Sequence, residues 1–86
     1  MTEPSLAIPY DIIRDLTVTA TGFVFDPRSG RSFSVNETGL VAMRAFLEGL
    51  DLFETKVRLI AKFSASSDVV DAGLNSFVRQ LNRHLA

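Results

Sequence analysis

The chain of 86 residues contains no cysteine and only one histidine, His84. Without thiols it forms no disulfides, thiolate zinc sites or iron–sulfur clusters, and it has no cysteine nucleophile. A Ser/His/Asp site needs a packed and oriented imidazole, whereas His84 stands at the end of an expected helix, where a histidine suits the helix dipole. We therefore expect a protein that is not an enzyme.

The chain also lacks an excess of charge of one sign and has no long apolar run. Nine Lys and Arg stand against ten Asp and Glu, for a net charge of −1, whereas nucleic-acid binders usually carry a basic face. No apolar run approaches the ~18 residues of a membrane span. The N-terminus, Met1–Pro4, is acidic and no apolar segment follows it, unlike a secretory signal. We expect a cytoplasmic protein without a membrane partner, and the charge disfavours a nucleic acid as its partner.

Motifs for cofactors and metals are scarce as well. The five glycines are dispersed and form no phosphate-binding loop. Asp68 and Asp71 lie three residues apart, but their place in the first turn of an expected helix is explained by the helix dipole. A metal needs several converging ligands. We expect no metal and no cofactor.

What the chain does have is the composition of one small folded domain. It is 47% hydrophobic and 22% charged and contains seven phenylalanines, each of which covers ~150–250 Å² when buried. We expect residues 1–15 to form a partly flexible N-terminal arm and residues 16–86 to form the domain. The segment Tyr10–Leu16, where the arm meets the domain, is open between an extended lead-in and a single helical turn.

A β-hairpin is the clearest local signal. From Thr17 the hydrophobic period is two, and two runs of strand-forming residues, Phe23–Phe25 and Arg31–Val35, are joined by Asp26–Gly30. Proline presets φ for the first corner of a tight turn, and glycine takes the left-handed position that closes it. In the second run, alternation should turn Phe33 and Val35 toward the core and Ser32 and Ser34 toward solvent.

Three helices should follow the hairpin. The first is capped by Asn36 and runs to about Glu48, with Gly49 as its stop. The second begins at Asp51-Leu52-Phe53-Glu54, where an acidic residue precedes Glu54 by three positions as in a capping box. Its apolar face is expected to be Phe53, Val57, Ile60 and Phe63.

The third helix, from about Asp68 to His84, has the most regular apolar stripe, formed by Val70, Leu74, Phe77, Val78, Leu81 and Leu85. Gly73 interrupts it at a cost of ~1 kcal/mol relative to alanine. Strands that precede helices favour an α+β fold over a parallel α/β sheet. We therefore predict an α+β domain with a three-stranded antiparallel β-meander followed by three helices.

The segment Gly22–Gly39, which contains FDPRSGRSFSVNETG, resembles the PqqD-like family of small peptide chaperones. The family's Val-Asn pair at the end of the hairpin corresponds to Val35-Asn36, and its helix-closing glycine to Gly49. The aromatic at the end of its second helix corresponds to Phe63, and the Phe-Leu-x-x-Leu end of its third helix to Phe77–Leu81. The resemblance spans roughly residues 16–85 and is greatest to members encoded beside kinases related to the HPr kinase.

The chain departs from the family at two places. Gly73 stands where the third helix commonly has an acidic residue, which puts any charged contact from that position in doubt. Asn82–Leu85 replaces the usual Gly-Leu ending.

The resemblance implies a winged helix-turn-helix-like domain, a recognition element for ribosomally made, modified peptides. Such a domain binds the leader of a precursor peptide as an added strand and presents it to a modifying enzyme, a radical SAM or an HPr-kinase-like enzyme. An edge strand can offer unpaired main-chain groups to such a peptide. The expected binding residues are those of the edge strand, Arg31, Ser32, Phe33, Ser34 and Val35, and those of the helix beside it, Val70, Gly73, Leu74, Phe77 and Val78.

Two other functions stay open at this stage. One is a protein–protein adaptor for an HPr-kinase-like partner, which the sequence does not separate from peptide binding. The other is a DNA-binding winged-helix regulator, which Asp68 and Asp71 disfavour because they lie at the end of the helix that would enter the groove. The same free strand edge could pair two copies, so we expect a monomer or a weak homodimer.

Overall fold

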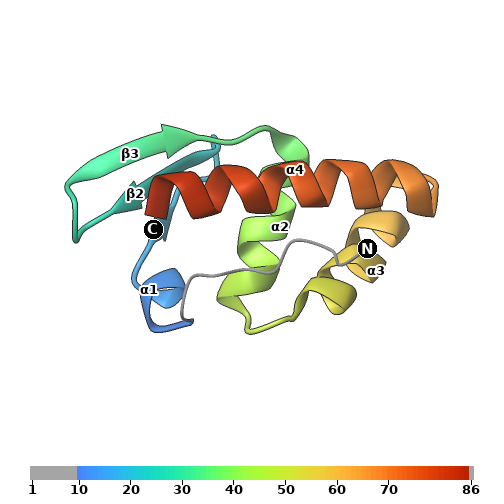
Figure 1. The fold of residues 1–86 in the computed structure, drawn as a ribbon, viewed down its shortest axis with the longest axis horizontal. Helices are drawn as coiled ribbons and strands as arrows, with labels where there is room; N and C mark the ends of the chain where they lie inside the picture. The colour runs from blue at the N-terminus through green and yellow to red at the C-terminus, as the bar shows by residue number, and fades with distance from the viewer. Residues whose placement is uncertain (1–9, 86) are drawn as a thin grey trace.

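Residues 10–85 are described by a computed structural model, in which a three-stranded sheet precedes the main helices (Figure 1). The strands are β1 (Thr17–Val18), β2 (Phe23–Asp26) and β3 (Arg31–Ser34), ordered β1-β2-β3 and antiparallel throughout. The predicted α+β fold with its three-stranded meander is confirmed. The first nine residues of the expected N-terminal arm lie outside the described residues.

The chain before the sheet forms a short helix, α1 (Tyr10–Arg14), which decides between the two interpretations of this segment in favour of a helical turn. The Ile13 side chain is only 1% exposed and belongs to the core. The Tyr10 hydroxyl donates to the carbonyl oxygen of Leu47 at 3.0 Å. Residues 10–14 are therefore packed against the domain, and α1 is a fourth helix beside the three that the sequence predicts.

The β2–β3 hairpin forms as predicted. Asp26 lies opposite Arg31, and Gly30 closes the turn with φ +72°. Phe33 and Val35 are half-buried, whereas Ser32 and Ser34 are exposed, which confirms the expected alternation. At the other end of the hairpin, Gly22 has φ +94°, and a Cβ there would lie 2.7 Å from the Val35 carbonyl oxygen.

The remaining helices begin and end within a residue or two of the predicted positions. They are α2 (Glu37–Leu47), α3 (Leu52–Phe63) and α4 (Ser67–Leu85). The Asn36 side chain caps α2 by accepting from the Gly39 amide at 2.8 Å. Asp51 and Glu54 form the expected capping box at the start of α3, with both of its hydrogen bonds present.

Helix α4 contributes much of the core and runs along most of the length of the domain, with the β2–β3 hairpin extending beyond its C-terminal end (Figure 1). All six residues of its predicted stripe are buried. They pack with residues of α1, α2, α3 and β2, including Ile13, Met43, Leu59 and Val24. No helix among residues 10–85 is both long and apolar enough to cross a bilayer.

The predicted apolar face of α3 is wrong in part. Phe53 and Val57 are 71% and 52% exposed, whereas Thr55 and Leu59 are fully buried. The helix is thus turned by about 100°, one residue's rotation, from the predicted orientation. The reason is that α2 and α4 both contact α3, and together they cover the side that carries Leu59 and not the side with the larger Phe53.

Candidate functional site

One edge of the sheet is formed by β3. The strand pairs with β2 on one side only, and within residues 10–85 no strand pairs with its other side. The Val35 amide donates to the Gly22 carbonyl at 2.8 Å, so Val35 points its main chain toward β2. Hydrogen bonding alternates along an antiparallel strand. Ser32 and Ser34 therefore direct their N–H and C=O groups away from the sheet.

The inner side of β3 lies against the C-terminal end of α4. The ring of Phe33 stacks on that of His84, with the centroids 4.4 Å apart and an interplanar angle of 3°. The Arg28 guanidinium, in the hairpin turn, donates to the Leu85 carbonyl at 3.1 Å and to the Asp26 carboxylate at 3.2 Å. These contacts fix the edge strand beside α4.

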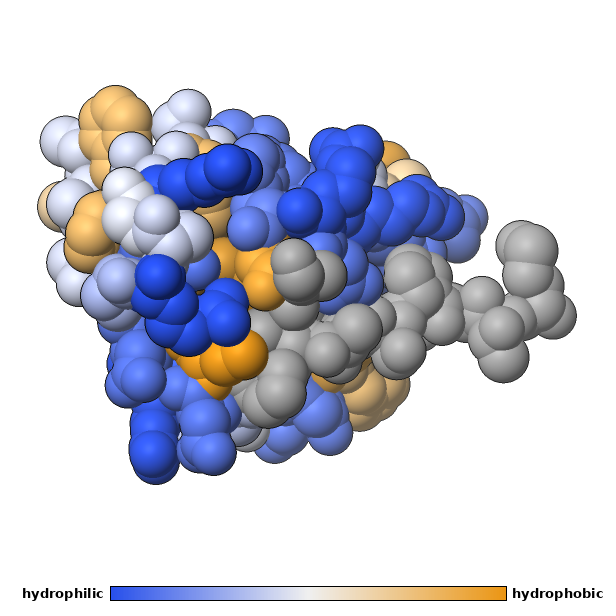
Figure 2. All heavy atoms as spheres, turned by 60° about the vertical axis from the view of Figure 1, so that its left-hand side comes forward, coloured by the Kyte–Doolittle hydropathy of each residue, from blue (hydrophilic) through white to orange (hydrophobic). Residues whose placement is uncertain are grey.

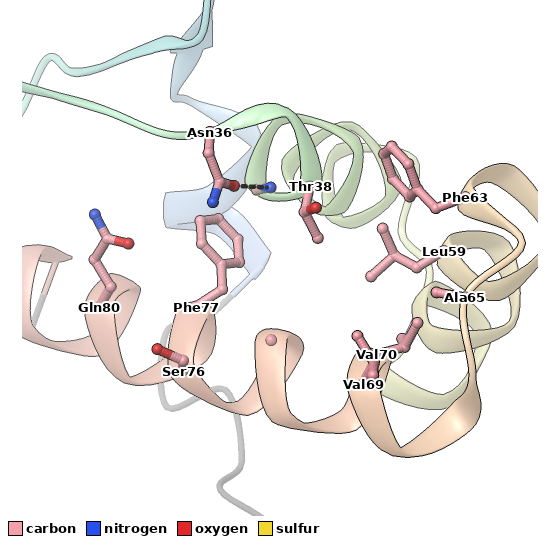
Figure 3. Close-up of a pocket in the computed structure, with 12 residues that line it drawn as sticks. Asn36, Thr38, Leu59, Phe63, Ala65, Val69, Val70, Ser76, Phe77 and Gln80 are labelled. Atoms are coloured by element: carbon pink, nitrogen blue, oxygen red, sulfur yellow. Dashed lines mark hydrogen bonds between the residues drawn. The ribbon is translucent and has the colours of Figure 1, made fainter.

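A hollow of about 280 Å³ opens where α4, the start of α2 and the end of α3 meet (Figure 3). Its walls are apolar and include Leu59, Phe63, Val70 and Phe77. Polar side chains lie around it, from Asn36, Thr38, Ser76 and Gln80. Asn36 follows β3 by two residues, so the hollow begins where the edge strand ends.

Two glycines in the hollow have opposite surroundings. A Cβ on Gly39 would come within 3.0 Å of both the Phe77 ring and the Val35 Cβ, so a side chain there would require these neighbours to move. A Cβ on Gly73 would meet nothing within 4 Å. Gly73 therefore leaves bare helix backbone in the wall of the hollow, and no packing among residues 10–85 accounts for it.

The predicted helix residues of the site are divided between the hollow and the core. Val70, Gly73 and Phe77 line the hollow. Leu74 and Val78 are 5% and 0% exposed and belong to the core, and neither is among the residues that line the hollow. The predicted strand residues Arg31, Ser32, Phe33, Ser34 and Val35 form the edge and the linker that leads to the hollow.

Sequence reasoning missed the polar residues around the hollow and also Val69, which is 64% exposed beside it. One signal was present, because Val69 is an apolar residue that lies off the stripe of α4. The polar residues carried no such signal, since Asn36 acts first as a helix cap and Ser76 and Gln80 resemble any exposed helix residue.

The opposite end of the strand edge is charged. A second hollow there is lined by residues of the hairpin turn and of the end of α4, namely Asp26, Arg28, Ser29, Arg31, His84 and Leu85. Arg28 is held by Asp26 and Leu85, whereas no ion pair within residues 10–85 involves Arg31. Arg31 is therefore the cation at this end that is available to a ligand.

The Asp26 side chain is 4% exposed. Burial alone would raise the pKa of Asp26, but hydrogen bonds from the Arg28 amide, the Arg28 guanidinium and the Ser29 hydroxyl, together with the Arg28 charge, lower it overall. The carboxylate accepts from the Arg28 amide at 2.9 Å. Asp26 thus acts as an anionic anchor of the turn, which holds Arg28 in place.

The arrangement offers outward main-chain groups, an apolar hollow with polar side chains around it, and one available cation. Among residues 10–85, no three His, Asp or Glu side chains lie close enough together to hold a metal ion. These features suit the binding of an extended chain. Comparisons with models of known protein families, with curated proteins and with solved structures gave no match.

Proposed function

We propose that this protein is a non-catalytic peptide-binding chaperone that binds the leader of a precursor peptide as an added strand and presents it to a modifying enzyme. The observation that carries the proposal is the edge of β3, where Ser32 and Ser34 direct their main-chain groups outward, directly before a hollow of peptide side-chain size. The resemblance of residues 16–85 to the PqqD-like family supports the same function.

Strand addition explains how such a small surface binds a peptide. Each incoming residue that pairs with Ser32 or Ser34 satisfies main-chain groups that otherwise bond to water, and it does so with little demand on sequence. Specificity must then come from side chains beside the strand. A peptide that continues past β3 reaches the hollow between Phe77 and Val70, which suits an apolar side chain.

Gly73 fits this arrangement. An exposed glycine inside a helix costs about 1 kcal/mol relative to alanine, and no neighbour in the described part of the chain requires it. A bound peptide main chain would use the space that a side chain at this position would fill. Gly73 stands where the family commonly has an acidic residue. In this proposal it therefore offers the helix main chain for contact with the peptide in place of a charge.

Arg31 adds a preference for direction. It lies at the start of β3, at the end away from the hollow, so an acidic residue of the peptide should lie near Arg31 and an apolar residue near Phe77. The charge contributes little, because an exposed ion pair is worth ~0–1 kcal/mol. The enzyme that receives the peptide, in this proposal, is a radical SAM or HPr-kinase-like enzyme, as the resemblance implies.

The test is a titration of the isotopically labelled protein with a synthetic leader of a precursor encoded near its gene, followed by backbone amide NMR shifts. We expect the largest shifts at Arg31–Val35 and at the α4 residues that line the hollow, and a scrambled leader of the same composition should cause none. Shifts spread evenly over the protein, or equal for the scrambled peptide, would contradict strand addition at this site.

A further inference from the structure

The rotation of α3 leaves an apolar ridge exposed on the surface. Phe53, Val57 and Ala61 follow one another at intervals of four residues, so they form one row along the helix. The side chains of Phe53 and Val57 are 71% and 52% exposed. With Leu50, this row, which we call the α3 ridge, borders a shallow, open surface hollow. The apolar surface of Phe53 faces water, and even a weakly bound partner would bury it.

We propose that the α3 ridge is the interface of a weak, two-fold symmetric homodimer in which α3 packs antiparallel against α3 of a second copy. The ridge is complementary in size to its own reversed copy. Val57 lies midway between Phe53 and Ala61, so a two-fold axis at Val57 places the large Phe53 of each copy against the small Ala61 of the other. Such self-complementarity is what a two-fold interface requires.

The charges beside the ridge select the antiparallel orientation. Glu54, Arg58 and Lys62 form the next row of the helix, with the acid toward its N-terminus and a base toward its C-terminus. Antiparallel packing about this axis keeps the two charged rows on the same side of the interface and brings Glu54 of each copy toward Lys62 of the other. The Arg58 side chains of the two copies would lie near each other at the axis, but in each copy Arg58 already pairs with Glu48 at 2.6 Å.

The size of the ridge sets the strength of the dimer. A helix of 12 residues is about 18 Å long, and one such helix covers well under the ~800 Å² per partner of a standard interface. A dissociation constant between about 10 µM and 1 mM is therefore expected. The ridge shares no lining residue with the hollow on α4, so the inference does not depend on peptide binding.

Disulfide trapping tests the geometry directly, because the chain has no cysteine of its own. In Val57→Cys the two thiols face each other across the axis, so mild oxidation of the full chain should yield a covalent dimer in a fraction that rises with protein concentration. Ala72→Cys, at an exposed position of α4, is the control for random collision. A dimer yield that is no greater for Val57→Cys than for Ala72→Cys would overturn the proposal.

Sedimentation equilibrium tests the affinity and the surface. Val57→Lys should raise the dissociation constant by on the order of ten-fold or more, because it places two like charges at the centre of the interface. Val69→Lys makes the same change at the exposed Val69 of α4 and should have no effect. A wild-type chain that stays monomeric up to about 1 mM, or equal effects of the two lysines, would show that the ridge is no homodimer interface.

Discussion

Gly39, in the first turn of α2, lies directly against the ring of Phe77 in α4, so that a Cβ on Gly39 would come within 3.0 Å of the Phe77 Cε1 atom. This contact brings the start of α2 close to α4 and sets the width of the hollow between them. The amide of the same glycine donates to the side-chain oxygen of Asn36, which caps α2. Gly39 therefore contacts the segment after the edge strand, stands in the first turn of α2 and lines the hollow.

Gly39→Ala should destabilise the protein despite the higher helix propensity of alanine. The new methyl group has the Phe77 ring on one side and Val35 on the other, so relief of the overlap needs a shift in the core, at a cost of about 1–3 kcal/mol. Gly73→Ala is the matched control, because its methyl group meets open space. It should stabilise the protein by up to ~1 kcal/mol.

Urea unfolding followed by circular dichroism measures both variants. Opposite signs of the change in unfolding free energy are expected. If Gly39→Ala were as stable as Gly73→Ala, the close approach of α2 to Phe77 would be wrong.

Ser34→Pro tests the edge of β3. Proline removes an amide that points away from the sheet, so the ladder to β2 stays intact while a bond to an added strand is lost. Binding of the leader peptide should weaken at least ten-fold by isothermal titration calorimetry, about 1.4 kcal/mol, close to the net value of one hydrogen bond. Ser34→Ala keeps the amide and should bind as the wild type does. Normal binding by a folded Ser34→Pro variant would place the peptide elsewhere.

Gly73→Leu tests the hollow separately from the edge. The Cβ meets nothing within 4 Å, so the leucine should leave the fold intact and fill the space beside Val70 and Phe77. Peptide affinity should fall by ten-fold or more, while Gly73→Ala should have a smaller effect. Affinity unchanged by the leucine would mean that the peptide, if it binds at β3, does not enter the hollow.

Asp26 makes the stability of the folded protein depend on pH. Its pKa is lowered in the folded protein, so its contribution to stability is complete above its unfolded pKa of ~3.9 and is lost as pH falls through the lower folded value. Asp26→Asn should reduce stability at neutral pH by on the order of 1–2 kcal/mol, because it replaces charged hydrogen bonds by neutral ones. The variant and the wild type should converge once the pH has fallen below the folded pKa of Asp26.

Thermal unfolding between pH 2 and 7 measures this convergence. Asp11→Asn is the control, since Asp11 is 80% exposed in its pair with Arg14 and an exposed pair contributes little. A constant difference between Asp26→Asn and the wild type at every pH would contradict the lowered pKa.

Local signals in the sequence were enough to predict most of the fold. The turn at Pro27 and Gly30, the cap at Asn36 and the capping box at Asp51 each depend on a few adjacent residues, and each fixes the end of an element. The apolar stripe of α4 is equally local. A helical period that is kept over 19 residues determines which face of the helix is buried.

What could not be predicted depends on contacts between elements. In α3, both Phe53 and Leu59 are apolar, and only the packing of α2 and α4 decides that Leu59 is buried. The hollow needs three helices to meet, and the regular stripe of α4 does not tell that Val70 and Phe77 line it whereas Leu74 and Val78 do not. The stack of Phe33 on His84 joins residues that are 51 positions apart, so no local pattern predicts it.

Thr55 carries the last prediction, because it is fully buried yet its hydroxyl finds no hydrogen-bond partner within the described part of the chain. A buried polar group without a partner costs about 1–3 kcal/mol. Thr55→Val keeps the shape and removes the hydroxyl, so it should raise the unfolding free energy by about 1 kcal/mol or more, measured by urea unfolding. Thr55→Ser keeps the hydroxyl, removes a methyl group and should destabilise. If valine destabilised the protein as serine does, the hydroxyl must have a partner, and the packing of α3 against α2 and α4 would differ from the arrangement described.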